Sequence, residues 1–194
     1  MVQPEPHKLQ DAMRALGALL EHRGHRFEVL VAGGSGLLLL GVLDRPTQDV
    51  DLVAIRTGKR WTKARPLPDQ LRNAAEAVRG DLGLPVDWLD PGPTDLLDLG
   101  LPQGIHDRTE RHDLGGLIVH AVSRFDQIHF KLYAAVDQGP DSKHAADLRL
   151  LDPTAAEWRA AADWCKTHDP SPAFSKQLEQ ALASFGLPQD DAGI

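Results

Sequence analysis

Two aspartates separated by one residue, Asp49 and Asp51, are the first feature of the sequence that suggests chemistry. The apolar composition of residues 50–55 predicts a β-strand, in which side chains two apart leave the same face. Neighbouring carboxylates repel each other, and a divalent cation between them removes that repulsion. Mg²⁺ binds one or two such carboxylates and completes its shell with water and phosphate oxygens. The pair therefore suggests a magnesium site, with an edge strand carrying two exposed acids as the alternative.

A glycine-rich turn, Gly33-Gly34-Ser35, precedes the aspartates. It follows a predicted strand over residues 27–31 and leads into a helix predicted over 35–43, with Ser35 as its N-cap. Glycines let a backbone approach a ligand closely, and a helix N-terminus attracts anions. The turn therefore suggests a phosphate site, although a tight strand-to-helix turn would also use glycine. Neither the dinucleotide pattern nor the Walker pattern fits this segment.

Three segments, taken in order, resemble the nucleotidyltransferases of the polymerase-β superfamily, and most closely their minimal AbiEii-like branch. The first combines Gly33-Gly34-Ser35 with the acid-bearing loop Arg45-Pro46-Thr47-Gln48-Asp49-Val50-Asp51. The second, residues 125–135, resembles a family helix ending in K-L-x-A, and the third, residues 143–148, resembles an R-D-x-x-D-L segment. In the third segment Lys143 and His144 depart from the family pattern.

The resemblance implies a role for each matching residue. The nucleotide would be bound by Gly33, Gly34, Ser35, Arg45 and Thr47, and the metal by Asp49 and Asp51. Lys131 would contact the triphosphate, and Asp147 would be a further acidic site residue. The alternatives are an ordinary surface lysine at Lys131 and a helix-surface ion pair between Asp147 and Lys143.

Superfamily polymerases also require a third carboxylate on a neighbouring strand. Residues 84–89 are expected to form a short strand, and Asp87 is the preferred candidate, with Asp90 second. Without a third acid, catalysis would be weak, or the protein would bind nucleotides without turnover.

The elements that must position these residues are strands gathered early and helices gathered late. Apolar periodicity predicts helices over residues 7–22, 68–79 and 123–138, and strands over 50–55 and 117–122. Three further helices are expected near 141–151, from Pro153 onward, and over 172–185. This order indicates an α+β fold, a small mixed sheet flanked by helices. Residues 1–122 would form the nucleotidyltransferase-like core and 123–194 a helical region packed on it.

Composition restricts the class of protein. The 194 residues carry a formal charge of −7, which argues against a protein that coats nucleic acid with its whole surface. Five cations nevertheless lie within residues 56–65, and could steer a phosphate-rich partner or form a solvated loop. No apolar run is long enough to cross a membrane, and the single Cys165 is expected to pack in a helix, so a cytoplasmic location is expected.

The expected function is that of a Mg²⁺-dependent nucleotidyltransferase, which moves a nucleoside monophosphate from an NTP to an acceptor. The acceptor would be an RNA, such as a tRNA, or a protein hydroxyl. The family suggests a toxin with a cognate antitoxin. The alternative is a nucleotidyltransferase-like module that binds nucleotides or regulates, without turnover.

Overall fold

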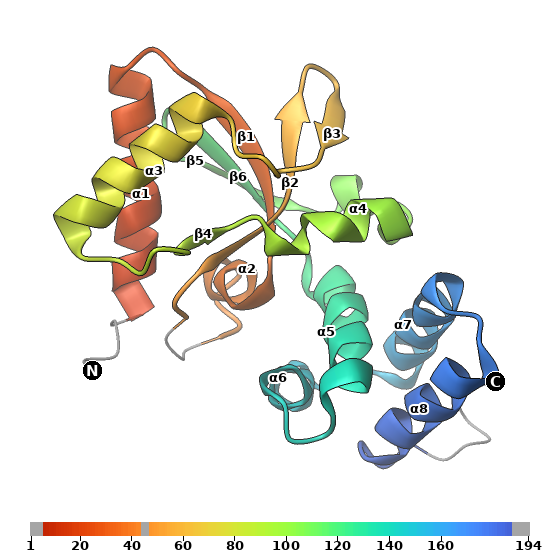
Figure 1. The fold of residues 1–194 in the computed structure, drawn as a ribbon. Coiled ribbons are helices and arrows are strands. Elements are labelled where there is room, and N and C mark those ends of the chain that lie inside the picture. Colours follow the sequence, from red (N-terminus) through yellow and green to blue (C-terminus); the bar gives the residue numbers. More distant parts are fainter. Residues whose placement is uncertain (1–5, 44–46, 188–194) are drawn as a thin grey trace. The chain divides into compact units, whose positions relative to one another are not determined.

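The computed structural model of the protein describes residues 6–43 and 47–187, and it confirms an α+β fold (Figure 1). The chain divides into two compact units, Met1–Ser123 and Arg124–Ile194. The N-terminal unit holds the sheet, and the C-terminal unit is helical. Each unit is described separately below.

The sheet of the N-terminal unit is mixed, with strand order β3-β2-β1-β6-β5 and β4 joined to β2. Strand β1 pairs antiparallel with β2 and parallel with β6, and β2 pairs parallel with β4. Strands β5 and β6 form an antiparallel hairpin. The strands are β1 (Phe27–Ala32), β2 (Val50–Thr57), β3 (Arg60–Thr62), β4 (Leu89–Asp90), β5 (Glu110–Asp113) and β6 (Leu117–Ala121).

Helices α1 (Pro6–His22) and α3 (Asp69–Leu82) lie side by side in Figure 1, and both contribute to one hydrophobic core with the sheet. The apolar side chains of α1 recur at three and four residues, so they form a continuous stripe toward the strands. Fully buried members of this core include Leu16 from α1, Leu71 from α3 and Leu52 from β2. The remaining helical elements of this unit are α2 (Gly33–Leu39), α4 (Leu96–Leu99) and the 3₁₀ turns η1 (Gly92–Asp95) and η2 (Ile105–Asp107).

A β-bulge in β2 decides which side chains face this core. The register shifts from Leu30 opposite Ala54 to Val31 opposite Leu52, so β2 has one extra residue there. Leu52 and Ile55 consequently both belong to the α1–α3 core, although they are three residues apart. The opposite face of the sheet carries the ion pair of Glu28 with Arg56, together with buried apolar side chains such as Leu30 and Ile118.

Three expected elements of this unit differ from the structure. Residues 85–88 form a turn instead of a strand, and only Leu89–Asp90 are extended. Helix α2 begins at Gly33 with Ala32 as its N-cap, so Ser35 does not cap it. Helix α3 continues through Gly80 and ends at Gly83, whose left-handed backbone (φ +59°) terminates it.

The helical unit contains α5 (Arg124–Gln138), α6 (Lys143–Leu151), α7 (Ala155–His168) and α8 (Pro172–Ala183). Ser142, Thr154 and Ser171 cap the last three, each accepting a backbone N–H three residues on. The sequence predicted that Pro153 would be the first residue of the third of these helices. In the structure Pro153 instead precedes Thr154, the N-cap of α7, and lies outside the helix. Cys165 is buried as expected, and burial raises the pKa of its thiol to about 12.

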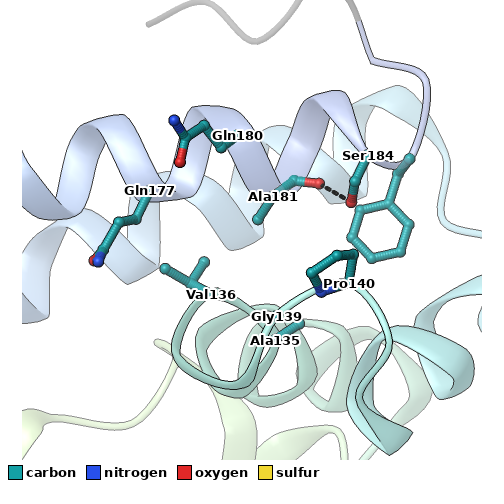
Figure 2. Close-up of a pocket in the computed structure, with 9 residues that line it drawn as sticks. Ala135, Val136, Gly139, Pro140, Gln177, Gln180, Ala181 and Ser184 are labelled. Carbon is teal, nitrogen blue, oxygen red and sulfur yellow. Dashed lines mark hydrogen bonds between the residues drawn. The ribbon is translucent and has the colours of Figure 1, made fainter.

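A cavity of about 300 Å³ lies between α5 and α8 (Figure 2). Its polar lining is limited to amides and a hydroxyl, and Ser184 donates its hydroxyl to the carbonyl oxygen of Ala181 at 2.6 Å. The described lining contains no ionisable side chain, which gives this cavity no acid–base chemistry. Within residues 6–43 and 47–187, no helix combines the length and apolar character needed to cross a bilayer.

Candidate metal centre

Three carboxylates gather at one end of the sheet. Asp49 immediately precedes β2, Asp51 is its second residue, and Asp90 ends β4. Each offers an oxygen that lies within 4.8 Å of the oxygens offered by the other two, and each residue is partly exposed. The sheet therefore carries an acidic triad that solvent reaches.

The parallel pairing of β2 and β4 brings Asp90 to Asp51. The two residues are register partners, as are Val50 and Leu89 one position earlier. Val50 and Leu89 are buried in the α1–α3 core, so the alternation of a strand turns both aspartates to the other face. The Val50 amide donates to the carbonyl of Trp88 at 2.7 Å and fixes this register.

Asp87, the preferred third acid in the sequence, is not part of this cluster. It is exposed in the turn that precedes β4. Asp90, the second candidate, occupies the position instead, because the strand begins only at Leu89. The buried side chain of Trp88, whose indole N–H donates to the Ala75 carbonyl at 3.2 Å, holds the turn against α3.

Gly33 leaves room for the carboxylate of Asp51. A Cβ at residue 33 would lie only 1.6 Å from Oδ2 of Asp51, and Gly33 also has a left-handed backbone (φ +65°). Both conditions exclude an ordinary side chain here. The first glycine of the turn therefore serves the acidic triad directly.

The other two residues of the turn also support the acidic strand. A Cβ at Gly34 would lie 2.8 Å from the Thr47 hydroxyl, which in turn donates to Asp49 at 3.3 Å. Ser35 is fully buried; its hydroxyl donates to Ala32 and accepts the Asp51 amide. The Gly-Gly-Ser segment thus positions the two aspartates, and the hydroxyl of Ser35 is occupied by the backbone.

The chain after Asp90 is held by two sets of contacts. Asp90 accepts the amide of Gly92 at 2.8 Å, which fixes one of its two oxygens. Thr94, fully buried, accepts the Ala64 amide at 2.7 Å, and Lys63 forms ion pairs with Asp95 and Asp98. These contacts fasten η1 and α4 to the segment around β3, and so limit movement of the third carboxylate.

Lys131 and Asp147 belong to the helical unit and contact each other. The Lys131 ammonium lies 2.7 Å from a carboxylate oxygen of Asp147, and the two residues are only 4% and 1% exposed. The ammonium is therefore engaged inside the helical unit, between α5 and α6. Lys143, the alternative partner of Asp147, is exposed. Arg45, which the resemblance assigns to the nucleotide, lies outside the described residues.

The triad suits a hard divalent cation. Octahedral Mg²⁺ holds its oxygens about 2.1 Å away, which places neighbouring ligands about 3 Å apart and opposite ones about 4 Å apart. The oxygens that the three carboxylates offer lie within 4.8 Å of one another, so side-chain rotations would bring them to such spacings around an ion. The set contains only oxygen donors, which favours Mg²⁺ or Mn²⁺ over Zn²⁺.

Sequence reasoning gave Asp90 second place because it extended the preceding strand too far back. Pro85 within residues 84–89 was the signal that could have shortened that strand, since proline is confined to strand edges and starts. Comparisons with known proteins identify no relative: no protein-family model, no curated protein and no solved structure matches the chain.

Proposed function

We propose that the protein is a divalent-cation-dependent nucleotidyltransferase, which transfers a nucleoside monophosphate from an NTP to a hydroxyl acceptor and releases pyrophosphate. The observation that carries the proposal is the acidic triad formed by Asp49 just before β2, Asp51 on β2 and Asp90 on the adjoining strand β4 of a mixed sheet. Its support from the sequence is the resemblance of the surrounding Gly-Gly-Ser and acid-pair segments to that superfamily.

The chemistry divides among these residues by their contacts. Asp49 and Asp51 would hold the cation, which would polarise the triphosphate and neutralise its charge. Asp90 has one oxygen bound to the Gly92 amide, and its other oxygen is the natural acceptor for the proton of the attacking hydroxyl. Gly33 keeps the Asp51 carboxylate in place beside the turn.

The second candidate function is that of a nucleotide-binding module without turnover. The burial of Lys131 against Asp147 favours it, because the cation that the resemblance assigns to the triphosphate is committed to a carboxylate. A transferase would then rely on the metal alone, or on cations elsewhere, to stabilise the leaving pyrophosphate.

The test compares two substitutions in the same segment of the full chain. Asp90→Asn removes a carboxylate from the triad. Asp87→Asn removes the same charge from the exposed turn, three residues earlier in the chain. Calorimetry with Mn²⁺ and each NTP measures binding, and α-³²P-labelled NTPs with total RNA or casein as acceptors measure transfer. We expect Asp90→Asn to lower the rate of transfer by about 10³-fold or more, and Asp87→Asn to leave that rate unchanged.

Binding and transfer results separate the two functions. NTP binding that requires Asp49 and Asp51, without label on any acceptor, would establish the binding module. Transfer that survives Asp90→Asn but not Asp87→Asn would overturn the assignment of the third carboxylate. If neither Mn²⁺ nor any NTP binds the intact chain, both functions fail.

A further inference from the structure

The β2–β3 hairpin exposes two cations that acids do not neutralise. Of the five basic residues in 56–65, Arg56 pairs with Glu28 at 3.0 Å, and Lys63 and Arg65 pair with acids of η1 and α4. Lys59 and Arg60 are exposed at the hairpin tip and have no acidic partner among the described residues. The pairing leaves the tip positively charged on a chain of net charge −7.

Aromatic rings adjoin this tip. Trp61, next to Arg60 on β3, stacks on His106 with ring centroids 5.6 Å apart and planes 12° from parallel. It also meets His120 of β6 edge-on at 5.2 Å. His106 is exposed and Trp61 is partly exposed, whereas the other three tryptophans of the chain are buried. The hairpin therefore presents ring surface beside unneutralised charge.

The Trp61 ring lies on the same face of the sheet as the acidic triad, whereas Arg60, the register partner of Thr57, alternates to the other face at the hairpin tip. Trp61 is the register partner of Arg56, and the ion pair of Arg56 with Glu28 places both on the face opposite the α1–α3 core. Asp51 is turned to that face as well. At about 3.3 Å per residue, the hairpin end of β2 lies about 20 Å from Asp51 along the strand.

We propose that the hairpin of residues 56–65, together with His106, binds single-stranded RNA, the acceptor of the transfer; this inference rests on the proposed function. Exposed cations contact phosphates, and aromatic rings stack on unpaired bases, which a duplex does not offer. A binding partner that is an acidic peptide would contact Lys59 and Arg60 but would have no use for the stacked rings of Trp61 and His106. The rings thus favour a nucleic acid over an acidic peptide.

The test measures RNA binding by the full chain without NTP or divalent cation. The probe is a fluorescein-labelled single strand of about 12 nucleotides, titrated between about 50 and 200 mM salt. We expect Lys59→Ala with Arg60→Ala to weaken binding about tenfold and to flatten the slope of log affinity against log salt by about 1.4. Arg72→Ala with Arg79→Ala removes the exposed Arg72 and the partly buried Arg79 of α3, which pair with Asp69 and Glu76; this variant is the control and should change neither.

A second pair of measurements tests the rings. His106→Ala should weaken binding about tenfold while leaving the salt slope intact, because stacking releases no counterions. RNA should quench the fluorescence of the intact chain, and Trp61→Phe should abolish that quenching, since the other tryptophans are buried. Circular dichroism confirms that each variant is folded.

Several outcomes would overturn the inference. These are equal affinity for a duplex of the same length, equal weakening by the α3 control, or no RNA binding at the lowest salt. Because Mn²⁺ and NTP binding are measured separately on Asp49 and Asp90 variants, the hairpin can fail while the metal centre stands. If the intact chain binds RNA but neither Mn²⁺ nor any NTP, the proposed function is refuted while RNA binding by the hairpin stands.

Discussion

Gly33 combines two separate requirements in one residue. Its left-handed backbone is unfavourable for any residue with a Cβ, and the space where a Cβ would stand is occupied by the Asp51 carboxylate. Gly24 meets only the first requirement: its φ is +71°, but nothing lies within 4 Å of its Cβ position. Comparing substitutions at Gly24 and Gly33 therefore separates the cost of backbone strain from the effect of a side chain that displaces the Asp51 carboxylate.

Gly33→Ala should lose both stability and cation binding. We expect Gly24→Ala to lower the free energy of unfolding by about 1–2 kcal/mol and to leave Mn²⁺ affinity unchanged. Gly33→Ala should cost about 1–3 kcal/mol more and weaken Mn²⁺ binding at least tenfold, because the methyl group displaces Asp51. Urea unfolding and calorimetry measure the two effects. Equal Mn²⁺ affinity in both variants would disprove the role of Gly33 in the site.

The buried ion pair between Lys131 and Asp147 is expected to contribute to the stability of the helical unit. Removing one partner of a buried pair strands the other charge, which typically costs about 3–5 kcal/mol. We expect that loss for Lys131→Met and recovery of most of it in the double variant with Asp147→Leu. The control Lys143→Met, at an exposed position, should cost under about 0.5 kcal/mol. A mild effect of Lys131→Met in urea unfolding would contradict a structural role for the pair.

At the scale of elements, the sequence predicts those with a strong period and misses those defined by their neighbours. Residues 27–32 and 50–57 contain short apolar runs typical of a strand buried on both faces, and α1 and α5 follow a clear helical period. Strand β3, with the sequence Arg-Trp-Thr, has no alternating apolar pattern and exists because it pairs with β2. Its pairing is a tertiary effect that local composition does not record.

The acid pair of the candidate site was predictable, and its surroundings were less so. Two acids two apart on a strand share a face whatever the fold, so Asp49 and Asp51 needed no tertiary information. Asp90 joins them only through the parallel register of β4 with β2, a contact about 40 residues apart in sequence. Likewise, the burial of Ser35 against two strands follows from packing, and it replaces the cap and phosphate roles that its position suggested.

Glu28 joins three strands, and its charge makes that junction sensitive to pH. Burial alone would raise the pKa of Glu28, but hydrogen bonds from His120 and Arg56, with the charge of Arg56, outweigh it and hold that pKa below 4.5. A lowered pKa means that the stabilisation is complete above the unfolded value, near 4.5, and is lost as the pH falls through the folded value.

Comparison with Glu28→Gln isolates this contribution from other carboxylates. We expect the wild-type protein to exceed the variant by about 1 kcal/mol in free energy of unfolding at pH 7, since the pair is partly exposed. The difference should stay constant down to about pH 5 and shrink below it. Urea unfolding across this range is the measurement, and a difference that grows on acidification would contradict the sign of the pKa shift.

At the scale of the whole molecule, charges of opposite sign are separated along β2. The acidic triad stands at one end of β2, and the unneutralised cations of the hairpin stand at the other. The triad holds three carboxylates close together in a chain that already carries −7, so repulsion at this site opposes folding. A site that stores repulsion in the absence of a cation makes stability dependent on that cation.

Divalent cations should therefore raise the thermal midpoint of the intact chain. At a concentration about 100 times the dissociation constant, the gain in free energy of unfolding is about 2.7 kcal/mol. Asp49→Asn should raise the midpoint of the cation-free protein by removing repulsion, and should abolish the further increase with Mn²⁺. Asp87→Asn should retain that increase, and NaCl at equal ionic strength should not reproduce it. Scanning calorimetry with and without Mn²⁺ tests this, and an undiminished Mn²⁺ effect in Asp49→Asn would locate the cation elsewhere.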